Sequence, residues 1–387
     1  MFGQILEITW MNLRNVGSRL GSSSVIVVGI AGVVAVLVAL LAMGAGFRSA
    51  LERSGEPDRA IVLRGGSTGE LSSGISNEAR NIVASFAGVI ASSGELYTVA
   101  DIPKRSNQSA ANVVIRGVED AAFAIRPEIR TVAGRRFEPG RGEVIVGRGA
   151  AAEFEGLDLG RSIELRNSTW TIVGIFEADG SAYESEIWAD LNSAQAAFRV
   201  GGFQSSMRIR VDDPALIADI AARVEDDPRL DLEVISEVDY YRAQANRLAS
   251  LITGFGYAVA SIMAIGAVFA ALNTMYSAVS NRTVEIGTLR ALGFRGLPVV
   301  VSVMFEALVL ALLGGALGAG IAYIGFNGMT VSTLNSSTFS QVAFDFAVTG
   351  RLMLLGLIWA VALGIVGGLF PAVRAARLPI TAALRRG

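Results

Sequence analysis

Few side chains in this sequence have the chemistry that enzymes use for covalent or metal-assisted catalysis. The chain contains neither cysteine nor histidine. These absences exclude a thiol nucleophile, a Cys/His zinc site and a Ser-His-Asp triad. The single lysine, Lys104, follows Pro103 rather than a glycine-rich run, so the P-loop pattern that cradles nucleotide phosphates is missing. The sequence therefore predicts no catalytic residue, no metal site and no cofactor-binding site.

Glu184 and Glu186 form a close pair of carboxylates beside aromatic residues, in the segment YESEIW. Paired acids could serve a glycosidase-like hydrolysis. At positions i and i+2 of a strand, however, the two side chains would face the same side and repel each other. We therefore favour turn or surface structure, or salt bridges within the surrounding domain, over a catalytic role.

The overall composition indicates an integral membrane protein. Of the 387 residues, 52% are hydrophobic and only 18% are charged, and the mean hydropathy is +0.49. This balance is too apolar for a soluble chain, and the net charge of −2 argues against nucleic-acid binding. Crossing a bilayer takes about 20 apolar residues. Four stretches meet this requirement: 25–46, 249–280, 299–326 and 350–373.

Residues 47–248, between the first two spans, are polar and alternate between strand and helix patterns. Strands are expected at 60–64, 113–118, 143–146, 162–165, 170–176 and 206–211, and helices at 77–87, 191–198 and 214–224. We predict an α-helical membrane protein with four transmembrane helices (1+3). A large α+β extracytoplasmic domain, with room for two lobes, is inserted between the first and second.

The arginines set the expected orientation. They flank the first span at Arg14 and Arg19 and follow the second and fourth spans, at 281–298 and 374–387, whereas the short outer loop 327–349 has neither arginine nor lysine. Both termini and the loop 281–298 are therefore expected in the cytoplasm. Residues 1–24 are expected to form an amphipathic helix at the cytoplasmic membrane surface.

Small residues recur at helical spacing within the last two spans. Gly314 and Gly318 lie four residues apart in the third span, as Gly364 and Gly368 do in the fourth. Such rows let membrane helices approach closely. They serve packing either within the chain or across a dimer.

Glu306 is a carboxylate within the third span. Its cost in a bilayer makes it a candidate functional group. The alternative is a position near the cytoplasmic interface, paired with an arginine such as Arg295. A proton-coupled transporter would need more buried ionisable groups than the spans contain.

The loop 281–298 reads NRTVEIGTLRALGFRGLP. Ile286, Leu289 and either Leu292 or Gly293 recur at the spacing of one helical face, and Gly293 followed by Pro298 supplies a stop signal. We expect a short helix that can transmit or receive a mechanical displacement. It is too small to be a catalytic domain.

The same loop resembles a motif of the permease subunits of MacB/FtsX-type (type VII, mechanotransmission) ABC transporters. That family carries Arg-x-x-Glu-Ile-Gly-x-Leu-Arg-Ala-Leu-Gly between its second and third spans. The matching residues are Arg282, Glu285, Ile286, Gly287, Leu289, Arg290, Ala291, Leu292 and Gly293. The closing segment LFPAVRAARLPITAALR resembles the family's C-terminal motif. The segments GEVIVG, WTIVGIFEADGSAYESEIWADL and SSMRIRV resemble its periplasmic domain.

The resemblance implies that the loop helix, continued by Phe294, is the coupling helix that docks on an ATPase. Ile286 and Leu289 would fill a groove on that ATPase, while Glu285 and Arg290 would pair with charges around it. ATP and Mg²⁺ would be bound by the ATPase, expected as a separate chain. Two permeases, as a homodimer or a heterodimer, and two ATPases would work together among the lipids of the bacterial plasma (inner) membrane.

The implied function is movement of the extracytoplasmic domain driven by ATP hydrolysis, for export or extraction of a substrate from the outer leaflet or periplasm. A periplasmic adaptor or cargo is a further expected partner. The alternative is an FtsX-like signal transmitter that activates an extracytoplasmic cell-wall hydrolase, although the domain here is larger than FtsX-like proteins usually carry. A membrane-anchored enzyme is disfavoured because histidine and cysteine are absent.

Overall fold

The computed structural model describes residues 20–166, 168–293, 295–335, 340–377 and 379. Residues 1–19 of the helix expected at 1–24, Phe294 and most of the tail 374–387 therefore lie outside the described residues, and residues 20–24 belong to the first long helix. The chain divides into two compact units. We call them the helical unit (Met1–Ala45, Leu251–Met329 and Phe346–Gly387) and the sheet unit (Gly46–Ser250 and Thr330–Asp345).

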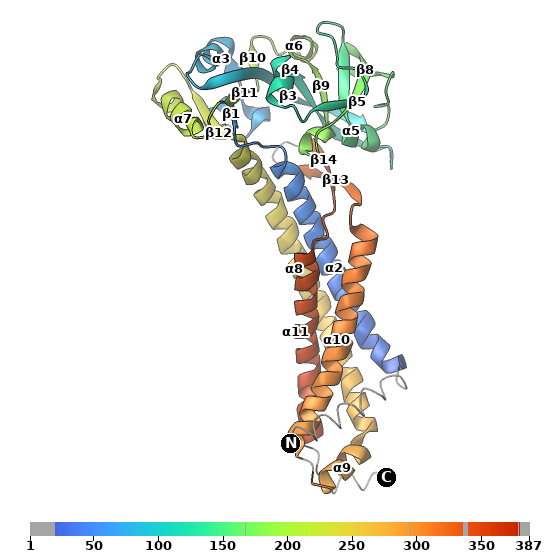
Figure 1. Cartoon of the computed structure of the whole chain (residues 1–387). Coiled ribbons are helices and arrows are strands. Elements are labelled where there is room, and N and C mark those ends of the chain that lie inside the picture. The colour runs from blue at the N-terminus through green and yellow to red at the C-terminus, as the bar shows by residue number, and fades with distance from the viewer. Residues whose placement is uncertain (1–19, 167, 294, 336–339, 378, 380–387) are drawn as a thin grey trace. The chain divides into compact units, whose positions relative to one another are not determined.

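Among the residues that the structure describes, four helices are long and apolar enough to cross a membrane. They are α2 (Leu20–Glu52), α8 (Glu237–Asn281), α10 (Gly296–Phe326) and α11 (Gly350–Ala376) (Figure 1). Each span expected from the sequence lies within one of them. The helices α2 and α8 extend well beyond the spans expected at 25–46 and 249–280. A charged residue ends a membrane span, but it does not end a helix. Glu237 and Asp239 instead favour the start of α8.

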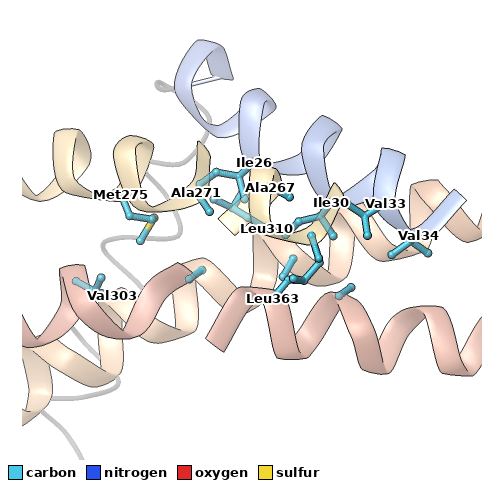
Figure 2. Close-up of a cluster of buried hydrophobic side chains, with 14 of the residues drawn as sticks. Ile26, Ile30, Val33, Val34, Ala267, Ala271, Met275, Val303, Leu310 and Leu363 are labelled. Atoms are coloured by element: carbon cyan, nitrogen blue, oxygen red, sulfur yellow. The ribbon is translucent and has the colours of Figure 1, made fainter. Parts of the chain in front are cut away.

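The core of the helical unit is made of aliphatic side chains from all four long helices. Figure 2 shows Ile30 and Val34 of α2 near Ala267 of α8, Leu310 of α10 and Leu363 of α11. The small side chains of α8 let the other helices pack closely against it.

The four glycines noted in the sequence lie at these helix–helix contacts. A Cβ atom added at Gly314 would lie 2.8 Å from the carbonyl oxygen of Val27, and one at Gly318 would collide with the carbonyl oxygen of Ala31. Gly364 and Gly368 face α10 in the same way: an added Cβ would lie 2.6 Å from the Cβ of Ala311 and 2.7 Å from that of Ala307, respectively. All four glycines therefore lie at contacts within the chain, and their use across a dimer stays a prediction.

The sheet unit is built on a ten-stranded mixed sheet in the order β12-β1-β11-β3-β4-β9-β6-β8-β5, with β7 paired to β8. The pairs β4–β9 and β6–β8 are parallel. The strands are β1 (Arg59–Arg64), β3 (Val89–Pro103), β4 (Ala110–Val118), β5 (Arg130–Gly134), β6 (Glu143–Gly147), β7 (Ser162–Leu165), β8 (Ser168–Glu177), β9 (Glu186–Asp190), β11 (Ser206–Val211) and β12 (Leu232–Ser236). The short strands β2 (Ile75–Ser76) and β10 (Phe203–Gln204) pair separately.

Two separate apolar cores form along this sheet. One includes Val62, Ile209 and Val224 and lies with α3 (Asn77–Ala84) and α7 (Leu216–Asp226). The other includes Ile115 and Val146 and lies with α5 (Arg148–Glu153) and α6 (Leu191–Phe198). The inserted domain therefore has two lobes that share one continuous sheet. The remaining short helices are α4 (Ala121–Ile125), η2 (Glu70–Ser72) and η3 (Ala182–Ser185).

The connection 327–349, expected to be a short outer loop, contains a β-hairpin that belongs to the sheet unit. Its strands are β13 (Thr330–Asn335) and β14 (Ser340–Asp345). Val342 and Phe344 are buried, and the backbone N–H of Ala343 donates to the Ser185 hydroxyl at 2.8 Å. Alternating side chains on β14 place these two apolar residues on one face, which the domain covers.

The lysine of the chain secures this hairpin. Lys104 Nζ lies 3.0 Å from Ser332 Oγ and 3.0 Å from Glu153 Oε1, and it donates to Gln341 Oε1 at 3.4 Å. Ser332 Oγ in turn donates to Glu153 at 2.7 Å. One cation therefore joins both strands of the hairpin to α5.

Candidate coupling site

The loop expected to contain a short helix does form one, α9 (Thr283–Ala291), at one end of the helical unit (Figure 1). Arg282 separates it from α8, and Gly293 follows its end with φ +95°. That backbone conformation is left-handed and favours glycine, which explains why the helix stops there.

One face of α9 is turned inward. Ile286 is only 6% exposed and belongs to the core of the helical unit, and Thr283 and Gly287 are buried with it. Ile286 lines a cavity with side chains of α8 and α10, among them Met275 and Val303. This corrects the expectation that Ile286 enters a groove on an ATPase. A short helix held at both ends covers its own bundle with its most apolar face, because that burial needs no partner.

The other face of α9 is open to solvent. Val284 is 43% exposed and Leu292 is 73% exposed, and Thr288 and Ala291 are exposed between them. These four residues follow the spacing of one helical face. We call them the outward face. Glu285, Leu289 and Arg290 are half-buried, Gly293 is exposed, and Phe294 lies outside the described residues.

Arg282 and Glu306 form a buried ion pair beside α9. The Arg282 Nη1 atom donates to Glu306 Oε2 at 3.1 Å, and the two side chains are 7% and 6% exposed. The expected pairing of Glu306 with an arginine is confirmed, but the partner is Arg282. Arg295 is exposed at the start of α10. Arg282 was expected on the surface that meets an ATPase, and the structure instead turns it toward the helical unit.

A second cluster of buried charges lies in the sheet unit. Arg116 is 1% exposed and contacts three carboxylates. Its Nε donates to Glu186 at 2.7 Å, and its Nη1 donates to Glu95 at 2.7 Å and to Glu70 at 2.8 Å. Glu95, Arg116 and Glu186 come from the neighbouring strands β3, β4 and β9, on the face opposite the core residue Ile115.

Two more arginines extend this cluster to the first turn of α8. Arg126 donates to Glu95 at 2.6 Å, and Arg208 of β11 donates to Glu237 at 2.9 Å. Both arginines are fully buried. We call the whole set the charge cluster: Glu70, Glu95, Arg116, Arg126, Glu186, Arg208 and Glu237.

The carboxylates Glu184 and Glu186 have separate structural partners. Glu186 binds Arg116 and also accepts a hydrogen bond from Trp188 Nε1 at 2.8 Å. Glu184 accepts hydrogen bonds from the backbone N–H groups of Ala178 and Gly180, both at 2.8 Å. The interpretation of this pair as turn structure and salt bridges is confirmed.

The arginines keep the buried carboxylates charged. Burial by itself raises the pKa of Glu70, but the nearby charges of Arg116 and Arg208 hold that pKa well below its usual range. Burial also raises the pKa of Glu95, and Arg126, Arg116 and Arg208 together lower it. Glu70 and Glu95 are therefore ionised near neutral pH.

Both parts of the chain match known protein families. Residues 23–227 match the MacB-like periplasmic core domain, and residues 257–380 match the FtsX-like permease C-terminal domain. The first match alone covers more than half of the chain.

Individual relatives are similar over most of the chain at low identity. The chain is 25% identical over 301 residues to the macrolide export ATP-binding/permease protein MacB of Rhodopseudomonas palustris, covering 71% of this chain and 43% of that protein. It is 24% identical over 383 residues to the MacB protein of Bdellovibrio bacteriovorus, covering 91% and 57%. The chain thus spans about half the length of these relatives. A similar solved structure is the periplasmic region of MacB from Actinobacillus actinomycetemcomitans, with TM-score 0.37, 12% identity, and coverage of 49% of this chain and 93% of that one.

Four helices able to cross a membrane, with a mixed sheet domain inserted between the first and second, define a multi-pass membrane protein of the ABC permease class. Within that class, the chain belongs to the MacB/FtsX-type family of ABC transporter permeases. It is accordingly a multi-pass protein of the inner membrane.

Proposed function

We propose that this chain is the permease subunit of an ABC transporter that couples ATP hydrolysis by an ATPase partner to movement of its sheet unit. This movement drives the export of a substrate, or its extraction from the outer leaflet or periplasm. ATP and Mg²⁺ are bound by the ATPase. The observation that carries this proposal is the outward face of α9, which presents apolar side chains to solvent from a helix that is fixed on its other side.

The outward face suits helix-in-groove recognition. Val284, Thr288, Ala291 and Leu292 supply a short row of small and apolar contacts. Glu285 and Arg290 flank that row, half-buried, and are placed to pair with charges at the rim of a groove.

The continuity of α8 supports transmission of a movement. α8 is one unbroken helix over Glu237–Asn281, and a single residue joins it to α9. Its first residue, Glu237, is bound by Arg208 in the charge cluster. A stiff helix fixed in this way carries a displacement of α9 toward the inserted domain.

The arrangement in the membrane follows from the arginine distribution and the family. Both termini and α9 lie in the cytoplasm and the inserted domain lies outside. Two permease chains, identical or related, assemble with two ATPases, and a periplasmic adaptor or cargo meets the inserted domain. The match of that domain to the MacB-like periplasmic core favours transport over activation of a cell-wall hydrolase.

The test is Leu292→Glu in the full chain, purified from its native membrane with its ATPase. A charge on the outward face should reduce co-purification of the ATPase by about tenfold or more. Leu159→Glu, the same change at an exposed leucine of the sheet unit, is the matched control and should leave co-purification unchanged. Full ATPase recovery and hydrolysis with Leu292→Glu would overturn the docking proposal.

A further inference from the structure

We infer that the buried Arg282–Glu306 ion pair is a positioning device that holds α9 at a fixed angle to the membrane-spanning helices. Force on the outward face then moves α8 and α10 together instead of bending the joint. This inference rests on the proposed function of α9, and it assigns the residues that make the coupling helix rigid.

The joint between α8 and α9 is the place where rigidity is needed. α8 ends at Asn281 and α9 begins at Thr283, so Arg282 alone connects them. Its backbone leaves the helical conformation, with φ −105° and ψ 12°. A break of this kind lets two helices change their angle. Here the side chain at the break is bound to a third helix, α10, through Glu306.

The surroundings of the pair favour a single arrangement. Val279, Val299 and Val303 line the same small cavity as both charged side chains. In such an apolar setting, separating the charges exposes each to a poor solvent. Buried polar pairs can specify one packing geometry for this reason, even where they add little net stability.

The positioning device is separate from the docking surface. Arg282 and Ile286 face the helical unit, whereas Val284 and Leu292 are exposed. A substitution in the ion pair should therefore leave the ATPase contact intact. It should change only how rigidly α9 is held against α8 and α10. This separation distinguishes a positioning role from a binding role.

The first measurement is a distance between spin labels on α9 and α10 in lipid nanodiscs. The chain contains no cysteine, so Thr288→Cys and Leu312→Cys, both exposed, provide a unique labelled pair. We expect one narrow distance distribution in the parent protein. Glu306→Gln should broaden or split it, and the exchanged pair Arg282→Glu/Glu306→Arg should narrow it again. Glu56→Gln, the same chemical change at an exposed glutamate of the sheet unit, should leave it unchanged.

The second measurement uses the complex with its ATPase, without the spin-label cysteines. Glu306→Gln should keep ATPase co-purification within about twofold of the parent, because the outward face is untouched. The reporter is Ser106→Cys, at an exposed residue of the sheet unit. Its labelling rate should change when nucleotide binds, and Glu306→Gln should reduce this change by about fivefold or more. The exchanged pair should restore most of this response.

Two results would overturn the inference. One is an unchanged distance distribution in Glu306→Gln. The other is a broadened distribution with full nucleotide response at Ser106→Cys. Failure of the proposed function has a different signature: Leu292→Glu retains its ATPase, whatever the distance measurement gives. If Glu306→Gln does not accumulate, the exchanged pair decides: a narrow distribution and a full response support the inference, whereas a broad distribution contradicts it.

Discussion

Arg116 is enclosed by three carboxylates, and each of them also binds another group. Glu70 accepts a hydrogen bond from Ser206 at 2.7 Å, Glu95 accepts one from Arg126, and Glu186 accepts one from Trp188. Arg116 and the three carboxylates thus form one connected network. A network of this kind rigidifies its surroundings, but the loss of one member leaves the others buried without their partner.

We predict that Arg116→Met destabilises the sheet unit by about 3–5 kcal/mol, because it leaves three buried carboxylates without their shared cation. Thermal unfolding of the full chain in detergent, followed by fluorescence of the buried Trp170 and Trp188, measures the effect. Arg229→Met is the matched control. Its ion pair with Asp227 lies at the surface, and its loss should leave the unfolding midpoint nearly unchanged, because surface ion pairs add little stability. Equal costs for the two variants would show that the network does not act as described.

The lowered pKa values of Glu70 and Glu95 predict the direction of the pH dependence. Because each pKa is lower in the folded state than in the unfolded chain, the stability these groups contribute is complete above the unfolded value of about 4.3. It is lost as pH falls through the lower folded values. The unfolding midpoint of the sheet unit should be flat from about pH 7 to pH 5.5 and fall below about pH 4.5. A midpoint that rises on acidification would contradict this assignment.

At the scale of single elements, the close contact of α2 and α10 depends on Gly318. We predict that Gly318→Ala destabilises the helical unit by about 1–3 kcal/mol, because the added methyl group collides with the backbone of α2. Gly320→Ala, in the same helix, is the control, since an added Cβ there meets nothing within 4 Å. Thermal inactivation in detergent, measured by loss of the monodisperse peak in size-exclusion chromatography, should separate the two. Similar losses for both variants would argue against this packing.

The long elements follow directly from the sequence, and the reasons are physical. The four spans were predictable because stretches that apolar and that long favour the interior of a bilayer over water. Strands β1, β4, β6, β7, β8 and β11 coincide with runs of β-branched and apolar residues. β9 was not expected, because the carboxylates of YESEIW resemble a surface segment. The signal that could have identified the charge cluster is the presence of single charges inside apolar runs, as at Arg116 in VVIRGV and Arg208 in SMRIRV.

The details that depend on long-range contacts were not predictable from local patterns. The hairpin β13–β14 has too little apolar surface to be stable alone, and it forms because Lys104 and Glu153 bind it from a distant part of the chain. The inward face of α9 is a similar case. The spacing of Ile286 and Leu289 predicts an apolar face, but it does not say whether a partner or the chain itself covers that face.

At the scale of the whole molecule, the proposed orientation predicts opposite exposure of two engineered cysteines. Ser106→Cys in the sheet unit and Thr288→Cys on α9 are both at exposed positions, in a chain that has no other cysteine. A membrane-impermeant maleimide applied to spheroplasts should label Ser106→Cys at once. It should label Thr288→Cys only after permeabilisation, because the arginine-rich loop stays in the cytoplasm. The reverse labelling pattern would show that the topology is opposite to the one proposed.

The order of the chain also sets an order of assembly during synthesis. The sheet unit is made from two segments, Gly46–Ser250 and Thr330–Asp345, with the second and third membrane helices between them. At about 5–20 residues per second, the complete hairpin is made about 5–19 s after the rest of the domain. During this interval Lys104 and Ser185 lack the hydrogen-bond partners that the hairpin later supplies. The inserted domain therefore stays incomplete until the third membrane helix has been synthesised, and a chain that stops within that helix lacks the hairpin.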